Sequence, residues 1–161
     1  MNDARERTIG LSVLDWQRAT AGGADIPIRF KVNGVSMRPL IRKDRDFVTI
    51  MPLRRAPRVG EIVLFYRPGA GANYVLHRVW KVRGERVRTL GDGCLYPDAW
   101  MDAAQIWGVA TLIERGERGI DPNRARWRAF GRVWMAMWWG RRWVWRGRRV
   151  LGRVMRAVRL G

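Results

Sequence analysis

Histidine occurs once in this chain of 161 residues and serine only twice, so few side chains are available for acid–base or nucleophilic chemistry. The single cysteine excludes an intrachain disulfide and is typical of a reducing compartment. No run of about 18 apolar residues is present, and the first 20 residues lack the apolar core of a secretory signal. We therefore expect a cytoplasmic protein without a membrane-spanning helix.

Acidic residues are also scarce, since 14 Asp and Glu stand against 32 Lys and Arg and leave a net charge of +18. So basic a chain is expected to bind polyanions, either nucleic acid or an anionic lipid surface. From Asp121 to Gly161 every ionisable side chain except that of Asp121 is an arginine, and six of the ten tryptophans lie there. We expect a globular domain over residues 1–120 and a basic tail over residues 121–161.

Apolar residues alternate with polar ones in several short segments before residue 120, which is the pattern of half-buried strands. These segments are 28–33, 46–51, 61–67, 73–82, 86–90 and 105–114. A short helix is expected over 8–19, because Val13 and Trp16 repeat its apolar face before Gly22-Gly23 ends it. The sequence thus predicts a mainly β domain of α+β class, with a compact antiparallel sheet and a short N-terminal helix.

The two rare residue types occur in segments that suggest a nucleophile and a base. Ser36 follows a predicted strand and a glycine and precedes Pro39, where a turn exposes the hydroxyl and leaves backbone N–H groups free for an oxyanion. A serine there is also a favoured turn cap, and His77 in an apolar strand is compatible with a purely structural histidine. If an imidazole activates a hydroxyl, the base is His77 and the nucleophile is Ser36 or Ser12.

The motifs that stand out, in chain order, are Gly34-Val35-Ser36-Met37-Arg38-Pro39 with Asp46, Gly60-Glu61-Ile62-Val63-Leu64-Phe65, His77-Arg78-Val79, Leu90-Gly91-Asp92-Gly93 with Asp98, and Trp107-Gly108-Val109-Ala110. Taken together in this order, they resemble the successive boxes of the signal peptidase I family. The resemblance covers about residues 30–115. It implies a β domain of signal-peptidase type and a serine endopeptidase that cleaves a precursor or leader peptide by acyl transfer, without a metal or other cofactor.

The resemblance also implies residue roles. The base before the Arg-Val pair is lysine in typical bacterial members and histidine in the archaeal and endoplasmic reticulum branch, so His77 is similar to the second type. Asp98 matches that branch's third catalytic residue, and Asp92 matches a site-organising aspartate. Gly93-Cys94 stands where the family has paired asparagines. The substrate is expected to lie extended beside the strand leading to Ser36. The expected substrate-binding residues are Asn33, Gly34, Val35 and Met37.

Other interpretations remain open at this stage. Cys94 is an alternative nucleophile beside His77. A Ser36–Lys81 dyad is the weaker choice, because Lys81 would share a strand face with His77 but lie about 13 Å along it. Two alternative functions belong to other classes: a noncatalytic peptide- or lipid-binding module of the same fold, and a basic nucleic-acid-binding protein.

The tail shows helical spacing of two kinds of side chain. Its basic stripes are Arg124, Arg128 and Arg132, then Arg142, Arg146, Arg149, Arg153 and Arg156. Its apolar stripes are Phe130, Trp134, Met137 and Trp138, then Val150, Leu151, Val154 and Val158. We expect this segment to form one amphipathic helix, or two if Gly140 and Gly147 interrupt it. The partner we expect is an anionic membrane surface bound through residues 124–160, because six indoles favour lipid over a nucleic-acid duplex. The alternative is that the helix packs on the β domain.

Overall fold

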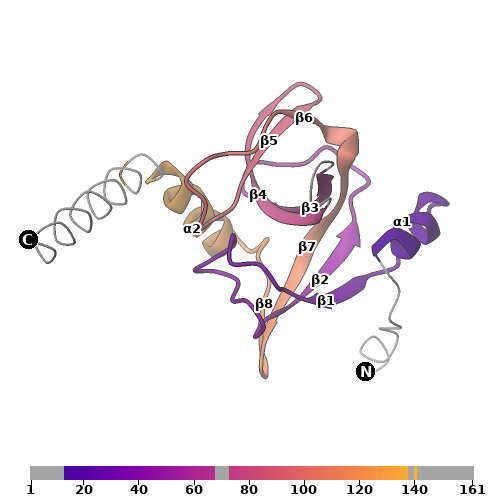
Figure 1. The fold of residues 1–161 in the computed structure, drawn as a ribbon, viewed down its shortest axis with the longest axis horizontal. Helices are drawn as coiled ribbons and strands as arrows, with labels where there is room; N and C mark the ends of the chain where they lie inside the picture. The colour runs from indigo at the N-terminus through magenta and orange to yellow at the C-terminus, as the bar shows by residue number, and fades with distance from the viewer. Residues whose placement is uncertain (1–12, 68–72, 138–139, 141–161) are drawn as a thin grey trace, which may run out of the picture.

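The segments with alternating apolar residues form strands of one antiparallel sheet in the computed structural model, which describes residues 13–67, 73–137 and 140 (Figure 1). Two α-helices flank this sheet at opposite ends of the view. In chain order the elements are α1 (Val13–Ala21), β1 (Ile28–Lys31), β2 (Phe47–Pro52), β3 (Ile62–Arg67), β4 (Asn73–Arg83), β5 (Arg86–Leu90), β6 (Met101–Asp102), a 3₁₀ turn (Ala103–Gln105), β7 (Ile106–Arg115), β8 (Arg118–Ile120) and α2 (Ala125–Ala136).

The strands follow the order β1-β2-β7-β3-β4-β5-β6, and β8 pairs with β7. The predicted mainly β class with an antiparallel sheet is confirmed. Strands β6 and β8 were not predicted, because two and three residues are too short to show a period. The register shifts at three β-bulges, two in β7 at Trp107 and Thr111 and one in β4 at Trp80, and each of them bends the sheet locally.

Helix α1 holds one end of the sheet through a buried tryptophan. Trp16 is fully buried, and its indole N–H donates to the carbonyl of Ile26 at 2.6 Å. The helix ends as predicted near the glycine pair, where Gly23 has a φ of 101° and its N–H caps the carbonyl of Thr20. Residues 8–12 of the predicted helix lie outside the described residues.

The core lies on both sides of β3, which explains its unbroken apolar run. Ile62 and Leu64 belong to the larger cluster, which includes Trp16, while Val63 and Phe65 belong to a second cluster on the other face. A strand covered on both faces cannot alternate in polarity. This central strand therefore gives its neighbour β4 a fixed position.

The first part of the expected tail packs on the β domain. Met135 of α2 is buried against Leu90, and the indole N–H of Trp134 donates to the carbonyl of Asp92 at 2.7 Å. Trp127 packs against the larger core cluster. Two of the six tail indoles thus contact the β domain. This agrees, for α2, with the alternative that the helix packs on that domain. The stripes over residues 138 and 141–161 lie outside the described residues.

Gly131 of α2 is the point of closest approach between this helix and the sheet. A methyl group there would lie 2.5 Å from Nη1 of Arg78, whose guanidinium is fixed by hydrogen bonds to Asp92 and to the carbonyl of Gly60. We expect Gly131→Val to lower the free energy of unfolding by about 1–3 kcal/mol through overpacking, measured by urea denaturation. Ala129→Val, at an exposed position of the same helix, is the control. Equal losses in the two variants would contradict this packing.

Neither helix has the length and apolar character needed to cross a bilayer, and the described residues contain no other candidate span.

Candidate active site

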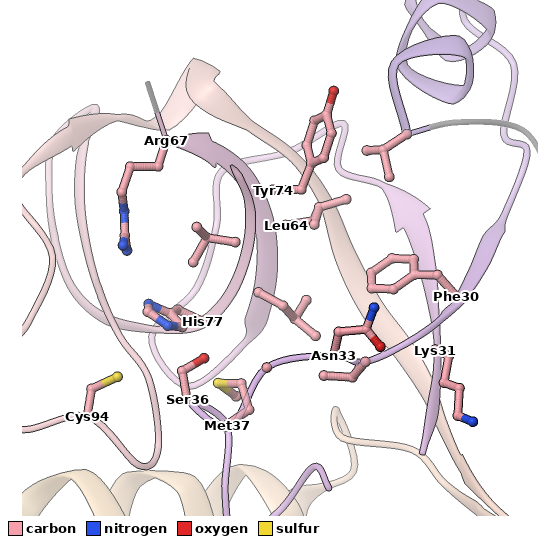
Figure 2. Close-up of a pocket in the computed structure, with 15 residues that line it drawn as sticks. Phe30, Lys31, Asn33, Ser36, Met37, Leu64, Arg67, Tyr74, His77 and Cys94 are labelled. Carbon is pink, nitrogen blue, oxygen red and sulfur yellow. The ribbon is translucent and has the colours of Figure 1, made fainter. Parts of the chain in front are cut away.

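A cavity of about 550 Å³ opens between the residues that follow β1 and the first half of β4 (Figure 2). Strand β5 pairs with β4 only from Arg78 onward, so among the described residues the stretch of β4 that lines the cavity has a strand neighbour on one side alone. Within the same part of the chain, β1 pairs only with β2, so its other edge has no strand beside it. The cavity is therefore bordered by two strand edges. Its lining includes Phe30, Val32, Asn33, Gly34, Ser36, Met37, Leu64, Arg67, Tyr74, Val75, Leu76, His77 and Cys94.

Ser36 begins the turn that follows β1, and this turn is fastened on two sides. The buried carboxylate of Asp46 accepts the N–H of Arg42 and binds the guanidinium of Arg115 on β7 at 2.6 Å. On the other side, the carbonyl of Ser36 accepts the N–H of Gly93 at 2.7 Å. The serine is thus held between the sheet and the loop that follows β5.

His77 reaches the same place from β4, where it pairs with Val63 of β3 and its ring is buried. A methyl group at Gly91 would lie 2.8 Å from Nε2 of His77, 2.7 Å from the carbonyl oxygen of Ser36 and 2.7 Å from Sγ of Cys94. These three atoms therefore converge around one glycine that has no room for a side chain. Figure 2 shows the side chains of Ser36 and Cys94 beside the His77 ring.

Asp98 holds the far side of the imidazole. Nδ1 of His77 donates to Oδ2 of Asp98 at 2.6 Å, and the hydroxyl of Thr89 donates to the same oxygen at 2.6 Å. Backbone bonds fix the aspartate, because its N–H donates to the carbonyl of Thr89 and its carbonyl accepts Nε of Arg88. With Nδ1 occupied as a donor, Nε2 is left as the basic nitrogen, and it lies at Gly91 beside the backbone of Ser36 and the thiol of Cys94.

These contacts change the proton affinities of both groups. Burial lowers the pKa of His77, but its hydrogen bonds with Asp98 and Cys94 and the charge of Asp98 outweigh this effect, so the pKa of His77 is raised above its ordinary value of 6.5. Burial raises the pKa of Asp98, but the hydrogen bond and charge of His77, with Thr89 and Arg67, outweigh it and lower that pKa. The carboxylate is thus ionised at neutral pH and supports an imidazolium.

A pH dependence follows from these directions. If His77 acts as a base it must be neutral, so activity is lost as pH falls through its raised pKa. We expect the acidic limb of a kcat/KM profile to lie above pH 6.5, the ordinary histidine value. In Asp98→Asn the residual activity should have its acidic limb at lower pH, because the imidazolium loses its counter-ion. A profile that is flat from pH 5 to 8 would contradict a histidine base.

Asp92 forms a buried ion pair with Arg78, the residue that follows His77 on β4. Its two oxygens accept Nε and Nη2 of Arg78 at 2.8 and 2.7 Å, and both side chains are completely buried. Through this pair the aspartate fixes the loop that carries Gly91 and Cys94. Of the two candidate carboxylates, the structure brings Asp98 to the histidine and gives Asp92 a supporting place.

Three of the four expected substrate-binding residues line the cavity, namely Asn33, Gly34 and Met37. The side chain of Val35 does not line it and is 55% exposed. The expectation that Lys81 shares a face with His77 is wrong, because a β-bulge at Trp80 shifts the register. Beyond the bulge Val82, rather than Lys81, continues the face of Val75 and Val79.

Sequence reasoning missed the residues that surround Asp98. Arg67 at the end of β3 pairs with Oδ1 of Asp98, and Thr89 on β5 binds Oδ2. The ring of Phe65 stands edge-on to His77, with 6.2 Å between centroids. One sequence pattern could have indicated Phe65 and Arg67: they alternate with Val63 on one face of a predicted strand, next to the predicted strand of His77.

Within residues 13–67 and 73–137, no group of three or more His, Cys, Asp or Glu side chains is arranged to hold a metal ion. Comparison with known proteins adds no assignment: no protein-family model matches the chain, and neither a curated protein nor a solved structure matches it.

Proposed function

We propose that this chain is a serine endopeptidase of the signal-peptidase type, with Ser36 as nucleophile, His77 as general base and Asp98 as the carboxylate that orients the base. The observation that carries the proposal is the placement of the only histidine, whose Nδ1 donates to Asp98 while its Nε2 lies at the turn of Ser36. A nucleophile, a base and an orienting carboxylate in this order form the arrangement used for acyl transfer on unrelated folds.

The geometry supports a two-step reaction. The hydroxyl of Ser36 attacks a peptide carbonyl and gives its proton to Nε2 of His77, which then protonates the leaving amine. Water, deprotonated by the same nitrogen, hydrolyses the acyl-enzyme and releases Ser36. The backbone N–H of Ser36 donates no hydrogen bond to any described residue, so it is available to the oxyanion.

The open strand edges support an extended substrate. A peptide entering the cavity can pair with the residues that follow β1 or with the first half of β4, and both edges lead to the position between Ser36 and His77. Main-chain pairing of this kind provides affinity, while the cavity selects side chains. The apolar lining from Phe30, Leu64 and Leu76 favours small or apolar side chains near the cut.

The test is cleavage of a randomised peptide library by the purified full chain, read by mass spectrometry. We expect cuts at a restricted set of sites, all absent with Ser36→Ala. If the chain binds library peptides with equal affinity in both forms and cleaves none, the noncatalytic peptide-binding function is correct and the peptidase is not.

We also propose that the chain associates with an anionic membrane surface through its C-terminal part. Exposed Arg124, Arg126, Arg132, Val133 and Met137 give α2 a basic and apolar outer side, and the Arg- and Trp-rich residues 141–161 follow it. Arginine contacts with anionic headgroups and tryptophan insertion at the interface would act together.

Vesicle flotation tests this second proposal. We expect the full chain to float with phosphatidylserine-containing vesicles, less so at high salt, and a variant ending at Met137 to lose most of this binding. The variant ends after α2 because removal of α2 would uncover Leu90 and Arg78 and so test the fold instead. Pure phosphatidylcholine vesicles are the control. Equal flotation of both forms would show that residues 138–161 are not the anchor.

A further inference from the structure

Two basic side chains line the cavity, Lys31 and Arg67, and Arg67 is the one that pairs with the carboxylate that holds His77. It is the last residue of β3 and lies four residues beyond Val63, the partner of His77, which is about 13 Å along the strand. Its side chain nevertheless reaches back to the histidine's carboxylate. Figure 2 shows the guanidinium extending toward the His77 ring from the side away from Ser36 and Cys94.

The two oxygens of the Asp98 carboxylate have different partners. Nη2 of Arg67 donates to Oδ1, while Oδ2 accepts Nδ1 of His77 and the hydroxyl of Thr89. Phe65 lies near both side chains, with the guanidinium carbon of Arg67 6.0 Å from its ring centroid and the imidazole edge-on at 6.2 Å between ring centroids. The side chain of Arg67 is half exposed, yet it makes one specific ion pair with the largely covered carboxylate that holds His77.

We propose that Arg67 is a positioning residue that acts on His77 through Asp98, by occupying Oδ1 and offsetting part of the negative charge that the carboxylate presents to the imidazole. The inference rests on the proposed function, in which His77 must be neutral to accept a proton. A histidine that is paired too strongly with a carboxylate stays protonated and cannot act as a base. Arg67 keeps the base available at neutral pH.

The surroundings of His77 assign this effect to Arg67. The loop after β5 presents Asp98 and Cys94 to the ring, and β3 presents Arg67. On β4 itself, Arg78 is turned to Asp92. Without Arg67, Asp98 is still held by Thr89 and by its backbone bonds, so its contact with Nδ1 survives. The whole carboxylate charge then acts on the imidazole and a neighbouring cation is lost, and both changes raise the pKa of His77.

The single histidine allows a direct test by NMR titration of its ring in the full chain, expressed with a histidine-free tag. In Arg67→Gln we expect the titration midpoint to move to higher pH than in the wild type, whereas Arg67→Lys, which retains the charge, should stay close to it. Arg67→Met, which keeps the apolar stem, is a second charge-removing variant if the first does not fold. Arg118→Gln removes one charge from exposed strand β8 and should leave the midpoint unchanged.

The kinetic counterpart is a severalfold loss of kcat/KM at pH 6 in Arg67→Gln that disappears at pH 9, where the base is neutral in every variant. An unchanged or lower midpoint in both charge-removing variants overturns the inference. Because the titration needs no substrate, it decides the role of Arg67 even if no peptide is cleaved. If the wild type cleaves peptides but the His77 midpoint does not move in the Arg67 variants, the proposed role of Arg67 is rejected and the proposed peptidase function stands.

Discussion

Replacing Ser36 by alanine will abolish peptide cleavage, with an expected loss of about 10⁶-fold in kcat, because members of a nucleophile–base unit fail together. His77→Ala should cause a loss of the same order, and the double variant should be no worse than either single one. The measurement is single-turnover cleavage of the best library peptide. Ser36 is only partly buried at the start of a turn, so the substitution leaves the fold unchanged, which urea denaturation will check.

The chain supplies its own matched controls for this experiment. Ser12→Ala changes the other serine and should keep full activity. Cys94→Ala removes the competing nucleophile at the same imidazole, and we expect it to retain most of the activity. Activity that survives Ser36→Ala but not Cys94→Ala would assign the reaction to the thiol.

The second large effect separates the two aspartates. Asp98→Asn should lower kcat by about 10⁴-fold, because the amide can present its N–H₂ to the ring and favour the wrong tautomer. Asp92→Asn should instead lower the free energy of unfolding by about 3–5 kcal/mol, because Arg78 is completely buried and would lose its counter-charge. The predicted outcome is one variant that is folded and inactive, and another that is unstable but active where folded.

Both variants are assayed at a temperature where circular dichroism shows them folded. A large activity loss confined to Asp92→Asn would reverse the assignment of the orienting carboxylate. Equal destabilisation of the two would mean that the Arg78–Asp92 pair carries no special energetic weight.

Local patterns in the sequence predict most of the sheet. The alternation that marks 46–51 and 86–90 depends only on neighbours along the chain, and the strands form there as Phe47–Pro52 and Arg86–Leu90. Lys81 was misplaced because one extra residue at a bulge reverses the faces of everything beyond it. No local pattern announces such a bulge.

Some residues of the candidate site could likewise be predicted from the sequence, and others could not. Ser36 and His77 could be named because serine and histidine are rare in this chain, and Asp98 because its position matches the resemblance to the signal peptidase I boxes. Arg67 could not, since its contact with Asp98 depends on how β3 aligns with β4 and where the loop after β5 returns. The docking of α2 was similarly undecided, because an amphipathic helix suits a protein surface and a lipid surface equally well.

The position of α2 also bears on the biosynthesis of the chain. Strands β1 to β8 all precede it, yet its Gly131 covers Arg78 and its Trp134 binds the loop of Asp92 beside the proposed catalytic site. A nascent chain that has completed the sheet therefore still leaves its ion pair open to water on that side. We expect the Arg78–Asp92 pair to be shielded from water, and the loop after β5 to reach its final position, only after synthesis has passed α2.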